Sequence, residues 1–163
     1  MKKIAVLISG SGSNLEAIIN ACNSKNIDGT VISVICNDPK AYGIERAKNL
    51  NIEVRIINHK EFLTREDFDD ELDSYLTQVS PDLIVLAGFM RILGNKITKK
   101  FDNKMINLHP SILPLYPGLN THEKVLQNND KNHGITIHYV SVSYTHLRAH
   151  ETRGNLVCRL LLE

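Results

Sequence analysis

The chain has 163 residues, 42% of them hydrophobic, and a formal net charge of +1, so it is long enough for one globular domain with a sizeable core. Because its charges are interspersed and form neither a basic stripe nor an acidic tail, we expect no nucleic acid partner. The apolar run of residues 4–8 is too short for a signal peptide or a membrane span, and the widely spaced Cys22, Cys36 and Cys158 are typical of reduced side chains in a cytoplasmic protein.

Apolar runs bounded by turn residues predict strands over residues 4–8, 31–36, 52–57, 83–87, 105–108 and 134–140. Amphipathic segments predict helices directly after the glycine-rich loop of residues 10–14 and over residues 42–50, 64–79, 94–101 and 121–128. Thr64 is the expected N-cap of the longest helix, with Asp67 at its third position. The last strand alternates apolar with polar residues, as a half-exposed strand does.

Strands that alternate with helices predict an α/β fold with three layers, in which helices cover both faces of a mostly parallel, Rossmann-like sheet. Ligands bind such sheets at the carboxyl ends of the strands. The glycine-rich loop and the Asn107–His109 segment both lie at these ends and are therefore candidate site segments. The acidic run of residues 61–73 is interpreted as the solvated outer face of a helix.

The composition changes abruptly near residue 141. Residues 1–141 contain 12 Lys, 15 Asn and 18 Ile, whereas residues 142–163 contain only Asn155 from this set. These amino acids have AT-rich codons, and residues 143–153 look like a translated sequencing-library adapter. We therefore predict one domain over residues 1–141 and a non-native tail over residues 142–163, the alternative being an unusual terminal helix.

Asn107 and His109 form the most informative pair in the sequence. Residues two apart on an extended strand project to one side, and an amide donor beside an imidazole can stabilise an oxyanion and move a proton. Pro110, Pro114 and Pro117 stiffen the backbone that follows. An isolated Asn-x-His would be interpreted as a strand end before a surface loop, but the proline-spaced neighbourhood favours a catalytic pair.

The glycine-rich loop suits a phosphate group. Gly10 and Gly12 allow a tight turn, and the free N–H groups at the start of the following helix favour an anion. Leu15 stands where the dinucleotide-binding fingerprint has its third glycine, and no Gly-Lys-Ser/Thr follows, so this is neither that fingerprint nor a Walker loop. For the glycines alone, a plain strand–helix turn remains the alternative.

Taken together, the motifs give the chain a specific likeness over residues 1–141. Matching blocks occur in the order Ile8–Leu15, Leu86–Leu93, Ile106–Ser111, Leu113–Gly118, and His133–Gly134 with His138–Val140. In these blocks the chain resembles the phosphoribosylglycinamide formyltransferases, folate-dependent enzymes of purine biosynthesis. The resemblance implies that residues 1–141 form a catalytic domain of the formyltransferase type.

The resemblance also implies a role for each block. Gly12, Ser13 and Asn14 look like the loop that binds the phosphate of glycinamide ribonucleotide. Arg65 matches a folate-contacting arginine. The wall that holds the pterin of the cosubstrate 10-formyltetrahydrofolate is matched by Met90, Arg91, Ile92 and Leu93. Asn107 and His109 match the catalytic pair for formyl transfer, and no metal is implied.

One residue departs from the family pattern. Where the family has an aspartate that keeps the catalytic histidine protonated, this chain has Thr145, and the acidic loop expected after Ser141 is missing. A neutral side chain cannot hold an imidazolium as a carboxylate does. We therefore expect the chain as written to have low activity and low stability.

Two other functions fit parts of the sequence. A formyltetrahydrofolate hydrolase would use the same residues with water in place of the amine. A noncatalytic Rossmann-type nucleotide-binding module would use the glycine-rich loop, with Asp38 holding a ribose. A zinc site at His146 and His150, with His133 and His138 upstream, is not favoured because no carboxylate or cysteine completes the set. His133 and His138 are assigned structural roles, and His122 is interpreted as a polar residue near a helix start.

Overall fold

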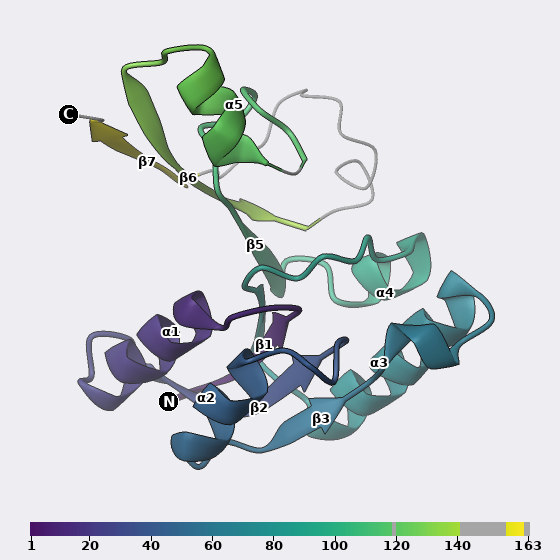
Figure 1. The fold of residues 1–163 in the computed structure, drawn as a ribbon. Helices are drawn as coiled ribbons and strands as arrows, with labels where there is room; N and C mark the ends of the chain where they lie inside the picture. The colour runs from purple at the N-terminus through teal and green to yellow at the C-terminus, as the bar shows by residue number, and fades with distance from the viewer. Residues whose placement is uncertain (119, 141–155, 162–163) are drawn as a thin grey trace.

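A seven-stranded sheet forms the centre of the computed structural model, with the strand order β3-β2-β1-β4-β5-β6-β7 (Figure 1). The structure describes residues 1–118, 120–140 and 156–161, the last range by its backbone alone. The strands are β1 (Lys2–Ile8), β2 (Gly29–Cys36), β3 (Val54–Ile56), β4 (Leu83–Leu86), β5 (Met105–His109), β6 (Asn132–Tyr139) and β7 (Leu156–Leu161). Strands β1 to β5 are parallel, and β6 is antiparallel to both of its neighbours.

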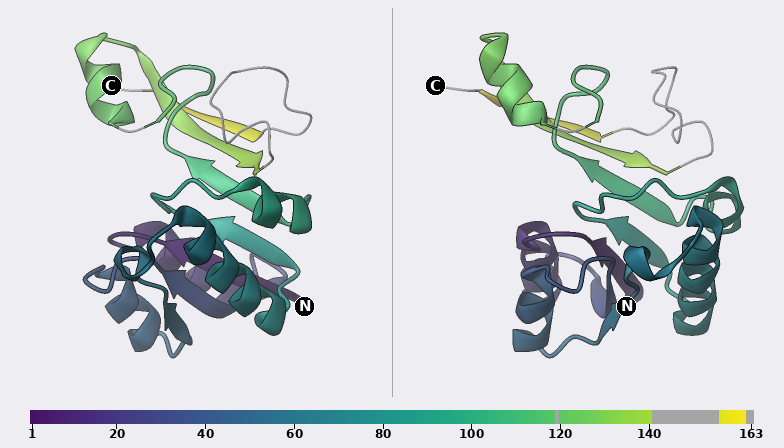
Figure 2. Two further views of the ribbon diagram at one scale, coloured as in Figure 1. Left: turned by 90° about the vertical axis from the view of Figure 1, so that its right-hand side faces the viewer. Right: turned by 45° about the vertical axis from the view of Figure 1, so that its right-hand side comes forward.

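Helices cover both faces of the parallel part of the sheet (Figure 2). They are α1 (Ser13–Asn23) and α2 (Gly43–Asn49) on one face, and α3 (Arg65–Val79) and α4 (Asn95–Lys100) on the other. The 3-10 turn η1 (His59–Glu61) precedes α3, and α5 (Thr121–Gln127) lies at the antiparallel end of the sheet beside β6 (Figure 1). On β1, Val6 packs with α1 and α2, whereas the next residue, Leu7, packs with α3 and α4. Because successive strand residues point to opposite faces, a fully apolar β1 places its side chains in two separate cores.

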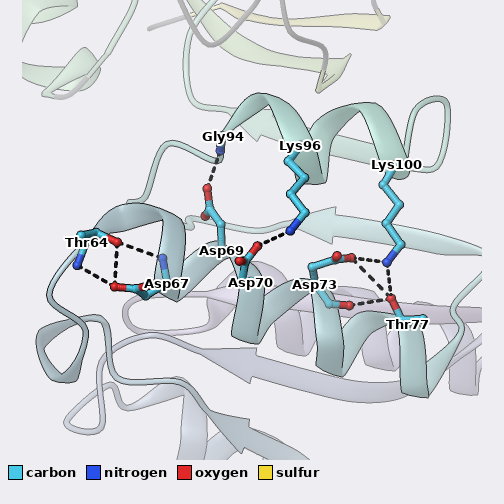
Figure 3. A network of polar contacts seen from close by, with 9 residues as sticks. All are labelled: Thr64, Asp67, Asp69, Asp70, Asp73, Thr77, Gly94, Lys96 and Lys100. Atoms are coloured by element: carbon cyan, nitrogen blue, oxygen red, sulfur yellow. Dashed lines mark hydrogen bonds and ion pairs between the residues drawn. The ribbon is translucent and has the colours of Figure 1, made fainter.

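Helix α3 begins as the sequence predicts. The Thr64 hydroxyl accepts a hydrogen bond from Asp67 N at 3.1 Å, and the Asp67 carboxylate accepts one from Thr64 N at 3.2 Å, forming a capping box (Figure 3). Helix α4 lies along α3, and Lys96 and Lys100 reach acidic residues of α3 (Figure 3). The Lys96–Asp70 pair is exposed and the Lys100–Asp73 pair is partly exposed, so both contribute little. The α3–α4 contact depends mainly on buried apolar residues such as Ile97.

Strand β6 alternates as predicted, but its polar residues are the buried ones. Thr136 and His138 are 0% and 6% exposed, whereas Ile135 and Tyr139 are 37% and 44% exposed. Hydrogen bonds explain this orientation, because Thr136 Oγ1 donates to Ser111 O at 2.7 Å and accepts from Leu113 N at 3.0 Å. Thr136 thus fixes the segment after β5 with a buried hydroxyl that both donates and accepts a hydrogen bond.

The predicted α/β class, the mostly parallel sheet and the order of the elements up to residue 140 are confirmed, with boundaries shifted by a few residues. The 3-10 turn η1 was not predicted. In the predicted tail, residues 142–155 and 162–163 lie outside the described residues, while β7 pairs its backbone with β6. An exposed sheet edge accepts any apolar extended segment, so the tail's origin stays a prediction.

Two features are absent from the part of the chain that the structure describes. The first is a disulfide bond at Cys22 or Cys36, since both are free and buried. None of the helices among the described residues is both long and apolar enough to cross a membrane.

Candidate active site

The predicted site residues lie around one edge of the sheet, at the carboxyl ends of adjacent strands. The 10–14 loop follows β1, the loop of residues 88–94 follows β4, and Asn107 and His109 end β5. In the sheet, β4 lies between β1 and β5. Parallel strands bring these separate segments of the sequence to the same edge, as expected for a ligand site in an α/β sheet.

The 10–14 loop turns sharply at Gly12, which precedes α1. Gly12 has φ = 74° and is the N-cap of the helix, with no side-chain capping bond. Its backbone lies so close to Gly43 that an added Cβ would be 2.6 Å from Gly43 Cα. Ser13 and Asn14 are exposed in the first turn of α1, where the N–H groups have no helical partners. This geometry suits an anion.

Helix α2 supports the same loop. Gly43 N donates to Gly10 O at 3.0 Å, and Arg46 Nε donates to Ser11 O at 3.0 Å. Arg46 also forms an ion pair with Glu16 of α1. The loop is therefore held through its carbonyl oxygens, and the N–H groups at the start of α1 are left for a ligand.

We expect Gly12→Ala to be a damaging change in this loop. A non-glycine residue at positive φ costs about 1–3 kcal/mol, and the added methyl group would also overlap Gly43. Denaturant unfolding should therefore show a clear loss of free energy of unfolding. Gly10→Ala is the matched control, since nothing lies within 4 Å of its added Cβ. Equal stability of the two variants would contradict this interpretation of the loop.

The 88–94 loop divides its side chains between solvent and core. Met90 and Ile92 are 65% and 56% exposed, whereas Leu93 is 2% exposed. Arg91 is half-buried, with its guanidinium carbon 6.0 Å from the centre of the Phe68 ring. An apolar surface beside a cationic group is therefore available to a flat ligand, and only two of the four predicted wall residues offer exposed side chains.

The interpretation of residues 61–73 as a solvated helix face is wrong for Asp69. Its side chain is buried because it lies on the inner side of α3 beside Phe68, and its Oδ2 accepts a hydrogen bond from Gly94 N at 2.7 Å (Figure 3). Arg65 Nε lies 4.0 Å from the same oxygen. Asp69 thus connects the predicted folate-contacting Arg65 to the end of the 88–94 loop. Its other oxygen, Oδ1, has no hydrogen-bond partner among the described residues.

The Asp69 carboxyl should make stability depend on pH. Burial raises its pKa above the ordinary 3.8, although the Gly94 N–H and the charges of Arg65 and Arg91 act against this. A raised carboxyl pKa means that the folded state binds the proton more tightly than the unfolded state. The stability of the chain relative to Asp69→Asn should therefore fall as pH rises from about 3.8 through the raised pKa, and stay lower above it.

Thermal unfolding across this pH range checks the prediction. The amide of Asp69→Asn still offers an acceptor for Gly94 N and does not titrate. Asp70→Asn is the matched control, because it removes a neighbouring exposed carboxylate and keeps Asp69. A stability difference between the chain and Asp69→Asn that is constant with pH would show that Asp69 is not the group responsible.

Asn107 contacts a residue that sequence reasoning assigned to a structural role. It lies opposite His138 in the β5–β6 register, and its Nδ2 is 3.2 Å from His138 Nε2. His138 Nδ1 is 3.0 Å from the Tyr139 carbonyl oxygen, which can only accept, so Nδ1 carries the proton and Nε2 accepts from Asn107. Burial lowers the pKa of His138, the hydrogen bond to Tyr139 opposes this, and the charge of His109 lowers it further.

His109 faces the proline-rich segment that follows β5. Its Nε2 lies 3.1 Å from the carbonyl oxygen of Tyr116, to which it donates. The buried Ser111 hydroxyl lies 2.7 Å from Leu115 O and 3.1 Å from Tyr116 O, and therefore holds the same turn. The histidine ring is thus oriented by a backbone carbonyl. The position of Thr145 lies outside the described residues.

The arrangement offers donors for a developing negative charge, a group that can carry a proton, and an anion site. The Asn107 amide has two N–H groups, and donating one to His138 leaves the other for a ligand. Among the described residues, no group of three or more His, Cys, Asp or Glu side chains is placed to hold a metal ion. The His146 and His150 pair lies outside them. Strand register, which the sequence alone does not give, was needed to find His138.

A family model described as formyl transferase matches residues 2–146. The phosphoribosylglycinamide formyltransferase of Haemophilus influenzae is 47% identical over 141 residues, which cover 86% of this chain and 66% of the relative. The Escherichia coli protein of the same name is 46% identical over 138 residues, or 85% of this chain and 65% of the relative. The solved phosphoribosylglycinamide formyltransferase of Coxiella burnetii has a TM-score of 0.87 at 41% identity and covers 99% of this chain and 74% of its own.

The fold and the grouping of these segments define a Rossmann-like α/β protein with a candidate ligand site at the strand ends. The chain belongs to the formyl transferase family, which confirms the resemblance inferred from the sequence blocks. It spans 66% and 65% of the lengths of the two curated relatives described above.

Proposed function

We propose that this chain carries the formyl-transfer site of a phosphoribosylglycinamide formyltransferase. In this proposal the formyl group of 10-formyltetrahydrofolate moves to the amine of glycinamide ribonucleotide during purine biosynthesis. The observation that carries the proposal is the grouping of Asn107 and His109 with the 10–14 and 88–94 loops at one sheet edge. The names and identities of the relatives support it.

The two substrates would occupy different loops. The ribonucleotide phosphate would bind the N–H groups of Gly12, Ser13 and Asn14, where the start of α1 favours negative charge. The pterin would lie against the exposed side chains of Met90 and Ile92. The half-buried Arg91 and the buried Leu93 would hold this loop against the protein. The half-exposed Arg65 guanidinium is available to a carboxylate of the folate.

The reaction is acyl transfer between two nitrogens. The glycinamide amine attacks the formyl carbon, and the formyl oxygen becomes an oxyanion that accepts the second N–H of Asn107. As the carbon–N10 bond breaks, His109 in its protonated form gives a proton to N10, and it recovers one from the attacking ammonium group. The products are the formylated ribonucleotide and tetrahydrofolate, and no metal takes part.

His109 is held by a neutral partner, and this supports the proposal of impaired activity. The Tyr116 carbonyl accepts a hydrogen bond from the ring but lacks the full charge of the carboxylate that the family resemblance would supply. In our proposal residues 1–141 are the native formyltransferase part, and the residues from 142 onward, including Thr145, are foreign. Reading the source DNA across the junction tests the second point, and an uninterrupted native gene would contradict it.

Dependence on both substrates tests the proposed reaction. Chromatography of the reaction mixture should detect formylated glycinamide ribonucleotide only when 10-formyltetrahydrofolate and glycinamide ribonucleotide are both present. A formyltetrahydrofolate hydrolase would release formate at the same rate without the ribonucleotide. Adenosine monophosphate binding without folate binding would favour the noncatalytic module. That module is not supported by Asp38, whose carboxylate accepts from Lys40 N at 2.9 Å within its own turn.

A further inference from the structure

We infer that Ser9 is a positioning residue that holds the 10–14 loop and the 88–94 loop in a fixed relation to each other. The inference rests on the proposed function and deepens it, because it assigns one hydroxyl group to the alignment of both substrates. Ser9 follows β1 directly and precedes Gly10, so any displacement of Ser9 displaces the start of the 10–14 loop.

The Ser9 hydroxyl joins segments that are far apart in the sequence. It accepts a hydrogen bond from Met90 N at 2.7 Å and donates one to Asn37 Oδ1 at 2.5 Å. A serine hydroxyl has one hydrogen to donate. Here that hydrogen goes to Asn37, and the Ser9 oxygen accepts from Met90 N. Both bonds are therefore made at once, and one atom ties the ends of β1, β2 and β4 together.

Asn37 gives this junction a rigid base. Its side chain is 3% exposed, just beyond β2. His59 Nδ1 lies 2.8 Å from Asn37 O and donates to it, so η1 holds the Asn37 backbone. Asn37 is thus held at its backbone carbonyl by His59 while its side-chain oxygen accepts from Ser9. A buried residue with both of these bonds is costly to reorient, and Ser9 is thereby held in one orientation.

The position of Met90 makes the junction relevant to ligand binding. Met90 is the exposed residue with which the proposed pterin surface begins, and its backbone N–H is the group that Ser9 holds. The two loops follow neighbouring strands β1 and β4, so their relative position sets the distance between the bound phosphate and the bound pterin. Removing the hydroxyl should loosen both sites together, whereas a merely structural serine would affect stability alone.

Ser9→Ala in the full chain tests the inference, with affinities for glycinamide ribonucleotide and tetrahydrofolate measured separately by calorimetry. Loss of one or two hydrogen bonds predicts that each Kd rises by about 3- to 10-fold. Ser9→Thr, which keeps a hydroxyl, should restore both values. Ser33→Ala is the matched control, because Ser33 is a buried serine whose Oγ lies 2.9 Å from Tyr75 OH, away from both loops. It should lower the unfolding temperature and leave both Kd values unchanged.

Hydrogen exchange at the Met90 amide gives a second readout in the unsubstituted chain. Ribonucleotide bound at the 10–14 loop should slow this exchange, and this measurement decides the matter if Ser9→Ala does not fold. An increase in only one Kd, or a change no larger than that of Ser33→Ala, would overturn the inference while the proposed function stands. If the unsubstituted chain binds neither substrate, the proposed function fails. In that case the role of Ser9 is rejected as well if the Met90 amide of the ligand-free chain exchanges as fast as an amide without a hydrogen bond.

Discussion

Formyl transfer by this chain is expected to be about 10²- to 10⁴-fold slower than by the Escherichia coli relative under the same conditions. The reason is the partner of His109. A charged partner that orients and stabilises a catalytic imidazolium commonly contributes a factor of this size. Here the ring donates to the Tyr116 carbonyl, and the sequence has Thr145 where the family pattern has an aspartate. Steady-state turnover at saturating concentrations of both substrates measures the difference.

A binding measurement separates this cause from a failure to fold. If the 10–14 loop is intact, glycinamide ribonucleotide should still bind, because the contacts that α2 makes with the loop involve none of the residues after 141. A chimera that joins residues 1–140 to the part of the Haemophilus influenzae relative beyond the match should regain most of the lost turnover. Turnover of the original chain within tenfold of the Escherichia coli relative would refute the prediction.

The second large effect is expected for Asn107→Ala and His109→Ala in that chimera. Removal of one donor to an oxyanion costs about 10²- to 10³-fold in kcat, and removal of a positioned general acid costs about 10²- to 10⁴-fold. Because the two side chains act on the same tetrahedral intermediate, the double variant should lose much less than the product of the single losses. The KM for the ribonucleotide should change little, since in our proposal its phosphate binds the 10–14 loop.

Asn20→Ala is the control for these variants, because Asn20 is exposed on α1 away from the strand ends. Initial rates over a range of ribonucleotide concentrations separate kcat from KM. Should kcat stay at the level of the control in either single variant, Asn107 and His109 are not the transfer pair.

Local signals in the sequence were sufficient for most of the fold. The fully apolar β1 predicted a strand covered on both faces, and Thr64 with Asp67 predicted the start of α3; both are confirmed. Such features depend on residues close in the sequence. The 3-10 turn η1 was missed because it is short and is fixed by a hydrogen bond between His59 and Asn37 on another segment.

Tertiary contacts explain the errors at the site. The burial of Asp69 depends on where the Gly94 N–H lies, and the contact between Asn107 and His138 depends on the register of β5 and β6. On β6, hydrogen bonds to the segment after β5 outweigh the apolar character of Ile135 and Tyr139, so the alternation predicted a strand but not the buried face. Asn107 and His109 were identifiable because alternation on one strand places both on the same side.

The central place of β1 in the sheet also has a kinetic consequence. Ile4 pairs with Val31 on one side and with Leu83 on the other, so β1 keeps an open edge until β4 has been synthesised. Pairing across so long a stretch of chain requires loop closure before any stabilisation is gained, which slows folding. The 10–14 and 88–94 loops begin at the ends of these two strands, so both loops should reach their final arrangement in the same late step.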